Sequence, residues 1–293
     1  TFFFSFANQD QNIRKREGYM IVALSWIIMS VFGMMPYLLS GTIPNYSDAI
    51  FETVSGFTTT GASILTDIER LPEGILLWRS MTQWIGGLGI IVLTVAIFPL
   101  LGIGGIELFV AESPGPTSDK VHPRIRETAK RLWLIYFGLT ILLVVIYYLE
   151  GMSFFDAMNH SLTTMSTGGF STKNNSMAYF NSPLIQYTAV FFMFLAGTNF
   201  TLIYFAFKGH FNRVWASDEF RAYFISVGLL VVGIFAAVYF LMDDSFEKSF
   251  RDVLFQVVSL VTTTGYVSAD YTVYSNGLTI IFFMILFMGA CAG

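Results

Sequence analysis

The chain has 293 residues, of which 54% are apolar and 12% are charged, and its mean hydropathy is +0.62. Soluble domains carry about 25% charged residues, so this composition excludes an ordinary soluble enzyme and a disordered chain. The net charge of −4 offers no basic face to a nucleic acid. The single cysteine, Cys291, excludes an internal disulfide. We expect an integral membrane protein in contact with the lipid bilayer. Because the sequence starts at Thr1 and stops at Gly293 inside an apolar run, we interpret it as a fragment.

Six stretches approach the roughly 20 apolar residues that a membrane span requires. In chain order they are about 19–40, 76–100, 132–149, 184–207, 223–242 and 277–293, the last of them cut short. The intervening run 157–172 is too short and too rich in Ser, Thr and Gly to be a seventh.

Lysine and arginine predict the orientation, because they are enriched on the cytoplasmic side. Eleven of the 16 fall in the N-terminal segment, in 101–131 and in 208–222. We therefore expect these segments to be cytoplasmic, in the cell (inner) membrane, and the remaining loops to face outside.

Three segments on the predicted outer side share one pattern. They read YSDAIFETVSGFTTTGAS (46–63), FFDAMNHSLTTMSTGGFS (154–171) and FRDVLFQVVSLVTTTGYVS (250–268). In each one an Asp precedes a Gly by 13 residues. A repeat in a fixed register indicates one structural unit that is used several times.

The first half of each unit predicts a short helix. Asp48, Asp156 and Asp252 are expected N-caps, followed by helices over 48–57, 156–165 and 252–261. Ten helical residues rise about 15 Å, half the thickness of a bilayer core. The helix would therefore end inside the membrane, with its partially negative C-terminus available to a cation.

The second half of each unit is a Thr-, Ser- and Gly-rich tract that must return to the surface. Such backbone cannot face lipid, so it is buried in protein or lines a watery path. A ring of its carbonyl groups could replace the water shell of an alkali cation. One such tract would be an ordinary polar turn, but three in the same register favour pore loops. The predicted cation-binding residues are Thr58, Thr59, Thr60, Gly61, Ser166, Thr167, Gly168, Gly169, Thr262, Thr263, Thr264 and Gly265.

These motifs resemble the TrkH family of the Trk/Ktr/HKT potassium uptake superfamily. The resemblance is carried by FETVSGFTTTGAS (51–63), WRSMTQWIGGLGI (78–90), TTMSTGGFST (163–172), FLAGTNFT (194–201), VTTTGY (261–266) and MGACAG (288–293). It implies an all-α integral membrane fold, in which helix–pore-helix–filter–helix units have a pseudo-fourfold arrangement. Each unit supplies one filter glycine, here Gly61, Gly169 and Gly265. Glycine at the first position goes with potassium, whereas serine there goes with sodium in plant relatives.

The resemblance divides the chain into three of the four units. The first covers 1–107, the second 108–209 and the third, truncated, 210–293. The fourth unit and an N-terminal helix pair of many members are absent. The fragment is therefore expected not to conduct alone.

Glycines interrupt the second span of each unit. For Gly86, Gly87 and Gly89 we expect close helix packing rather than a gate. Ala196, Gly197, Thr198 and Asn199 interrupt the second, and Asn199 could contact a cavity or hydrogen-bond a neighbouring helix. For the third unit the resemblance implies a gating loop, with candidate residues Gly289, Ala290, Cys291, Ala292 and Gly293.

Four other polar residues invite a functional interpretation. Glu52, His160 and Gln256 each follow the aspartate of their unit by four residues. Their side chains either reach the outer interface or satisfy one another, or they hydrogen-bond the filter backbone from behind. Arg79, beside Trp78, is expected to be an interfacial anchor.

The charged segment 107–131 is either a solvated loop or part of a docking face. The resemblance implies a cytosolic nucleotide-binding regulatory subunit of the TrkA kind, and a homodimer in the membrane. The candidate docking residues are Lys120, Arg124, Arg126, Lys130, Arg131, Lys208, His210 and Arg213.

The predicted function is potassium uptake through a filter of backbone carbonyls, with K⁺ as cargo and no tightly bound cofactor. An enzyme is not expected, because the three histidines lie far apart and neither HExxH nor GxSxG occurs. The alternatives are sodium or non-selective cation transport, or a secondary transporter with broken helices, whose repeats would usually be inverted. Channel-like movement and coupling to protons or sodium both stay open.

Overall fold

The structure, a computed structural model, describes residues 15–89, 125–241, 245–269, 276–287 and 289. Within these ranges all regular structure is helical. In chain order the elements are α1 (Lys15–Gly33), α2 (Met35–Leu39), α3 (Tyr46–Phe57), α4 (Glu73–Trp84), the π-helix η2 (Ile85–Gly89), α7 (Ile125–Leu149), α8 (Phe154–Met165), the 3₁₀-helix η4 (Ser176–Tyr179), α9 (Pro183–Ala196), α10 (Phe200–Phe207), α11 (Phe211–Ala216), α12 (Asp218–Leu241), α13 (Phe246–Val261) and α14 (Asn276–Ile285).

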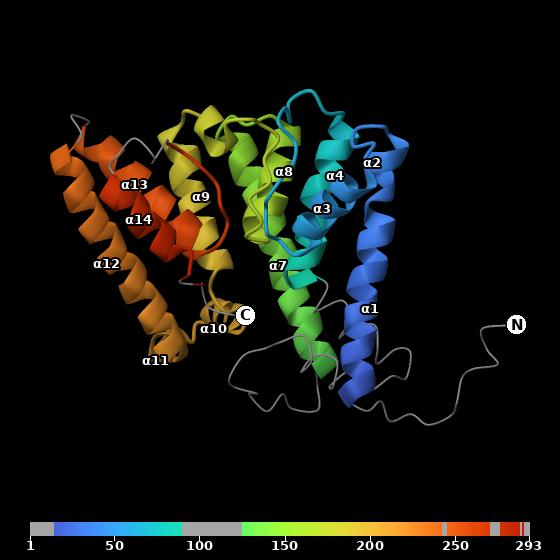
Figure 1. Ribbon diagram of the computed structural model, residues 1–293. Helices are drawn as coiled ribbons and strands as arrows, with labels where there is room; N and C mark the ends of the chain where they lie inside the picture. The colour runs from blue at the N-terminus through green and yellow to red at the C-terminus, as the bar shows by residue number, and fades with distance from the viewer. Residues whose placement is uncertain (1–14, 90–124, 242–244, 270–275, 288, 290–293) are drawn as a thin grey trace, which may run out of the picture.

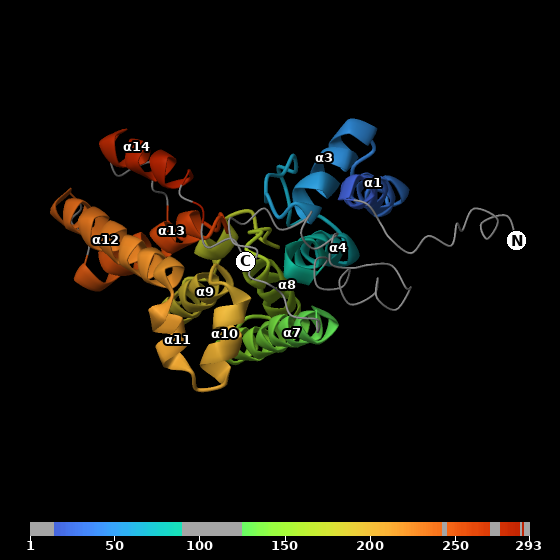
Figure 2. The ribbon, with the colours of Figure 1, turned by 90° about the horizontal axis from the view of Figure 1, so that it is seen from below.

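Three long helices are each followed by a shorter one. Helices α1, α7 and α12 run through most of the height of the molecule, whereas α3, α8 and α13 occupy only its upper half (Figure 1). Each short helix packs against the long helix that precedes it, in the pairs α1–α3, α7–α8 and α12–α13. Seen from below, these pairs follow one another across the molecule (Figure 2).

Two described helices, α7 over Lys130–Leu149 and α12 over Asp218–Phe240, are long and apolar enough to cross a membrane unbroken. Helices α9 and α10 meet that requirement only as a pair, because the chain bends by 107° between them. The span predicted over 184–207 is thus broken between the two helices, at the residues where the sequence shows an interruption. Gly197 follows the last turn of α9, and the side chain of Asn199 caps α10 by accepting from the Thr201 N–H at 2.9 Å. Asn199 thus serves as a helix cap.

The other three predicted spans are also shaped differently from simple helices. The stretch 19–40 is divided into α1 and α2 at Met34. The stretch 76–100 begins inside α4 and continues into η2, and residues 90–100 lie outside the described ranges. Of 277–293, the structure describes α14 and the residues up to Phe287, together with Gly289.

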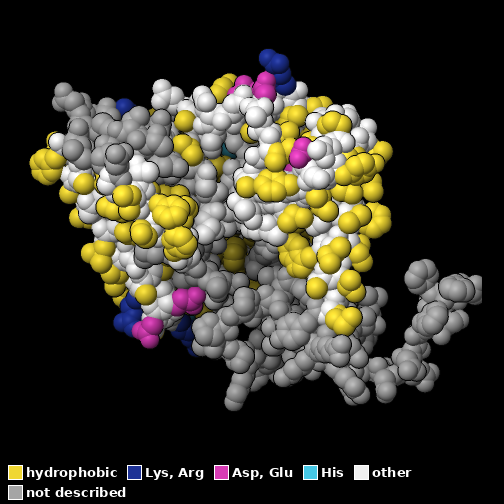
Figure 3. Space-filling model, in the orientation of Figure 1, with side chains coloured by type: hydrophobic (Ala, Val, Ile, Leu, Met, Phe, Trp, Pro, Cys, Tyr) yellow, Lys and Arg dark blue, Asp and Glu magenta, His cyan; other side chains and the backbone are white. Residues whose placement is uncertain are grey.

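The outer surface is apolar, as lipid contact requires. Large hydrophobic side chains are exposed along the long helices, among them Ile27, Phe32, Leu229 and Phe240. On the face shown in Figure 3, hydrophobic side chains cover the flanks, and charged ones gather toward the upper and lower ends. The protein is an integral membrane protein.

The aspartates of the repeat are not the N-caps that the sequence led us to expect. Asn45, Ser153 and Ser245 cap α3, α8 and α13 through their side-chain oxygens. Asp48 and Asp156 lie in the first helical turn, where their charge still favours the positive end of the helix.

The short helices are consequently longer than predicted. Helices α3 and α8 have 12 residues each, and α13 has 16. At 1.5 Å per residue, these lengths give rises of about 18 Å and about 24 Å. All three helices still end at the predicted residues, Phe57, Met165 and Val261.

Replacement of Gly56 by alanine tests the packing of α3 on α4. A Cβ at Gly56 would overlap the Thr82 hydroxyl, and overpacking of this kind costs about 1–3 kcal/mol. We expect Gly56→Ala to lower the melting temperature of the detergent-solubilised protein, measured by size-exclusion chromatography after heating. Gly138→Ala is the control, because Gly138 has no described atom within 4 Å of its would-be Cβ. Equal melting temperatures for the two variants would contradict the close packing.

Candidate functional site

Three loops with the same backbone conformation follow α3, α8 and α13. We define loop 1 as residues 58–61, loop 2 as 166–169 and loop 3 as 262–265. The second residue of each loop is a threonine in the left-handed region, with φ of 54° for Thr59, 50° for Thr167 and 59° for Thr263. The last residue is a glycine, with φ of 75°, 76° and 77° for Gly61, Gly169 and Gly265. The sequence repeat is thus matched by a repeat in backbone geometry.

The N–H groups of the loops bond back to the helices that they follow. In loop 1, Thr60 N donates to the Ser55 carbonyl at 3.0 Å; in loop 2, Gly168 N donates to that of Thr163 at 2.9 Å; in loop 3, Gly265 N donates to that of Ser259 at 3.2 Å. The carbonyl oxygens of loops 1 and 3 accept no hydrogen bond from any described residue. Every N–H group of loops 1 and 2 is bonded to the preceding helix, as are those of Thr262, Thr263 and Gly265 in loop 3, whereas loops 1 and 3 leave their carbonyl oxygens as acceptors.

Neighbouring loops touch through their glycines. A Cβ added to Gly61 would overlap the carbonyl oxygen of Gly168, and one added to Gly169 would overlap that of Thr264. Loop 1 thus lies against loop 2, and loop 2 lies against loop 3. Glycine is required at Gly61 and Gly169 both by the positive φ and by this close approach.

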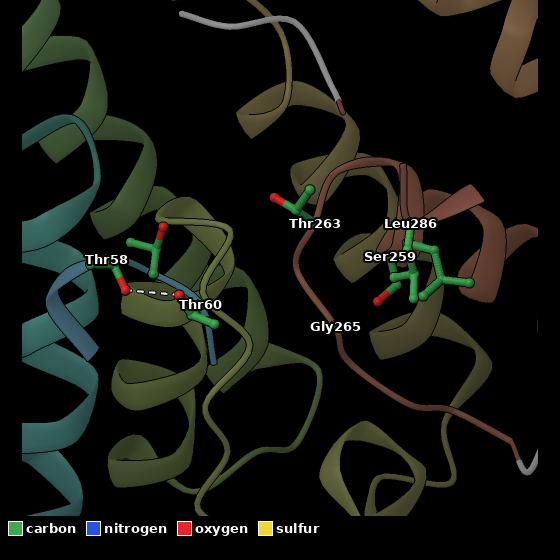
Figure 4. A pocket seen from close by; sticks show the side chains of 8 residues that line it. Thr58, Thr60, Ser259, Thr263, Gly265 and Leu286 are labelled. Atoms are coloured by element: carbon green, nitrogen blue, oxygen red, sulfur yellow. Dashed lines mark hydrogen bonds between the residues drawn. The ribbon is translucent and has the colours of Figure 1, made fainter. Parts of the chain in front are cut away.

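Loops 1 and 3 face each other across a cavity of about 400 Å³. Figure 4 shows Thr58 and Thr60 on one side of this cavity, and Ser259, Thr263, Gly265 and Leu286 on the other. Around Gly265, no described atom lies within 4 Å of a would-be Cβ. Loops 1 and 3 therefore border a common opening, which α13 and the chain after α14 also line through Ser259, Leu260 and Leu286.

Glu52 and Arg79 form a buried ion pair behind loop 1. Glu52 is 0% exposed and Arg79 is 1% exposed, and the distance between Arg79 Nε and Glu52 Oε1 is 2.8 Å. Glu52 also accepts from the Ser63 hydroxyl at 2.9 Å and from the Ile64 N–H at 3.1 Å. The expectation of Arg79 as an interfacial anchor is therefore wrong, since its charge is neutralised inside the protein by Glu52.

His160 occupies the corresponding position behind loop 2. Its Nδ1 lies 2.8 Å from the Asp156 carbonyl oxygen, which can only accept, so Nδ1 carries the proton. Its Nε2, 2.9 Å from the Ser171 hydroxyl, then accepts a hydrogen bond. Gln256, behind loop 3, is buried too. Glu52 and His160 therefore hold the chain just beyond the loops, and none of the three side chains reaches the outer interface.

Comparison with known proteins identifies the family. The family model TrkH, described as cation transport protein, matches residues 2–293. The chain belongs to the TrkH family.

Individual relatives carry the same name. The Trk system potassium uptake protein TrkH of Vibrio parahaemolyticus is 43% identical over 288 residues, which cover 96% of this chain and 59% of the relative. The Escherichia coli protein of that name is 42% identical over 287 residues, with the same two coverages. The crystal structure of the potassium transporter TrkH from Vibrio parahaemolyticus superposes with a TM-score of 0.84 at 38% identity, covering 99% of this chain and 60% of that one. This chain thus spans about three fifths of the length of these relatives.

In this TrkH-family chain, two residues that the sequence did not single out also hold the loops. Gln83 of α4 bonds to loop 2, and the Tyr266 hydroxyl bonds to Thr163 and to the His160 carbonyl oxygen. The sequence did offer a signal for Gln83, because it is a polar residue within an otherwise apolar span. Tyr266 directly follows Gly265 of loop 3, but nothing in the sequence repeat indicated where its side chain would point.

The gate candidates lie mostly outside the described residues. Gly289 is described and exposed, whereas Ala290, Cys291, Ala292 and Gly293 are not described. A Cβ at Gly86 would overlap the Phe57 carbonyl oxygen at the end of α3. This contact supports the packing interpretation for Gly86.

The buried ion pair predicts a large stability difference between two arginines. Arg79→Met leaves Glu52 buried and unpaired, which costs about 3–5 kcal/mol. Arg70→Met is the control, because Arg70 pairs with Asp67 on the surface, and such pairs contribute about 0–1 kcal/mol. Thermal unfolding of the two purified variants should show a marked loss of stability for the first variant only; equal losses would contradict the assignment of a buried pair.

Proposed function

We propose that this chain supplies three of the four pore units of a potassium uptake protein. Loops 1, 2 and 3 are its selectivity filter, and α3, α8 and α13 are the pore helices. The observation that carries this proposal is the threefold recurrence of one loop conformation, with a glycine of one loop packed against a carbonyl oxygen of the next. The names of the relatives, all potassium uptake proteins of Trk systems, support the choice of ion.

The chemistry of the loops suits a dehydrated monovalent cation. Most of their N–H groups are bonded to the pore helices, and the carbonyl oxygens of loops 1 and 3 accept no hydrogen bond from a described residue, so these oxygens can replace the water of the ion. The C-termini of α3, α8 and α13 end at the loops and add partial negative charge. Among the described residues no group of three His, Cys, Asp or Glu side chains could hold a metal ion. Carbonyl and threonine oxygens are therefore the ligands that we assign.

Potassium enters from the outer side in this proposal. The Lys and Arg distribution supports a cytoplasmic location for 101–131 and 208–222, which turns the loops toward the outside. A membrane potential then assists entry by about 2.3 kcal/mol per charge per 100 mV. The residues 289–293 form the gate in the third unit, and glycine at position 61 favours potassium over sodium.

The remaining partners are proposed from the resemblance. A cytosolic nucleotide-binding regulatory subunit docks on the basic residues of α7, α10 and α11, and the protein forms a homodimer. Arg131 donates to the Tyr204 hydroxyl at 3.0 Å, and Lys208 lies 5.1 Å from the centre of the same ring. Because both side chains contact Tyr204, the positive charges of Arg131 and Lys208 lie on one surface. Lys120 and Arg124 lie outside the described residues.

Replacement of Gly169 by serine tests the filter assignment. The variant Gly169→Ser adds a side chain that would overlap the Thr264 carbonyl oxygen at a positive φ. We expect the complete protein to restore growth of potassium-uptake-deficient cells at low potassium, and the variant to lose preference for rubidium over sodium in isotope uptake by about tenfold or more. The control is Gly41→Ser, because Gly41 has a φ of 70° but no described atom within 4 Å of its would-be Cβ. Undiminished selectivity in Gly169→Ser would overturn the assignment.

A further inference from the structure

Helix α4 presents two fully buried polar side chains to the loops. Arg79 is 1% exposed and Gln83 is 0% exposed. They are four residues apart, so they lie on one face of the helix, one turn from each other. A buried side chain of this kind is costly unless its polar atoms are bonded, and both residues are bonded to parts of the loop structure.

Gln83 makes two hydrogen bonds to the backbone of loop 2 and its exit. Its Nε2 donates to the Gly168 carbonyl oxygen at 2.6 Å, and its Oε1 accepts from the Phe170 N–H at 3.0 Å. The amide therefore clamps both sides of Gly169. There is no free space between loop 2 and the Gln83 amide, because a Cβ at Gly168 would overlap this amide.

Arg79 joins the two neighbouring units. Its Nε pairs with Glu52 of α3, and its Nη2 donates to the Ser63 hydroxyl at 3.3 Å, both in the first unit. On the other side its Nη1 donates to the Ser171 carbonyl oxygen at 3.4 Å, and its guanidinium lies 4.1 Å from the centre of the Phe170 ring. One side chain thus contacts the exits of loop 1 and of loop 2.

The backbone atoms held in this way lie at the boundary between loops 1 and 2. The Gly168 carbonyl oxygen is the atom that a Cβ on Gly61 would overlap, and the same oxygen accepts from Gln83. Its position is therefore determined from two sides, by the loop 1 glycine and by the α4 amide. The boundary between loops 2 and 3 is held differently, through Tyr266.

We propose that Gln83 and Arg79 are positioning residues that fix the gap between loops 1 and 2, and thereby the discrimination of this pore between potassium and sodium. The proposal rests on the pore function proposed above and adds residues outside the loops that determine selectivity. A carbonyl whose place is fixed cannot move inward to the smaller sodium ion. Loss of the clamp frees the Gly168 carbonyl oxygen, so sodium should gain more than rubidium.

The decisive measurement compares isotope uptake of rubidium and sodium by the complete protein and its variants, normalised to the amount in the membrane. Gln83→Met keeps the length of the side chain and removes both hydrogen bonds. We expect the rubidium-to-sodium ratio to fall by about tenfold. The matched control is Gln186→Met, because Gln186 is buried on α9 and its Oε1 has no hydrogen-bond partner among the described residues. It should leave the ratio within about twofold.

Two further variants test the proposal if Gln83→Met does not accumulate in the membrane. Gln83→Glu retains an acceptor for the Phe170 N–H but places a carboxylate against the Gly168 carbonyl oxygen. Arg79→Lys retains a positive charge for Glu52 but loses the fork that reaches Ser171. Both should lower the ratio. A purely structural role would reduce the two fluxes equally, and an unchanged ratio in the variants that accumulate would overturn the proposal. If the unsubstituted protein fails to take up rubidium selectively, the proposed function itself is refuted instead.

Discussion

The structure depends on one constraint: backbone inside a membrane must find its hydrogen-bond partners within the protein. In loops 1, 2 and 3 the N–H groups meet this requirement by turning back onto α3, α8 and α13. The left-handed threonines and glycines make that reversal possible. As a result, most N–H groups of the loops are bonded to the helices, and the carbonyl oxygens of loops 1 and 3 accept no hydrogen bond from a described residue. The surface that we propose for cation binding follows from the same geometry that allows the backbone to be buried.

Buried charged and polar side chains hold these loops in place. Glu52, Arg79 and His160 are all almost completely buried, and each is bonded to the chain just beyond a loop. Such groups are expensive in a low-dielectric interior unless they are paired, and here they are paired with one another or with backbone. Helix α4, which follows loop 1, also contacts α8 and loop 2, and α9, which follows loop 2, contacts α13, so neighbouring units support one another.

The sequence predicted the loops well because their signal is repeated. Three copies of a tract in one register are informative even though one copy is not, and the helices end at the predicted residues Phe57, Met165 and Val261. The helix starts were missed because Asn45, Ser153 and Ser245 compete with the aspartates as caps. The role of Arg79 was missed because its partner, Glu52, lies 27 residues away in the chain. Periodicity describes one helix at a time and carries no information on such pairs. The bend at 197–199 was visible as a polar interruption, but its angle depends on how α10 packs.

The conformation of Thr59, Thr167 and Thr263 shows that the surrounding protein, and not local preference, orders the loops. A β-branched residue in the left-handed region is a genuine outlier, and it costs about 1–3 kcal/mol. Three threonines that hold this conformation must be kept there by their surroundings. Local preference would drive each segment toward another shape if it were released as a free peptide. The conformation of the three loops is therefore a property of the assembled helix bundle and not of the loop sequences alone.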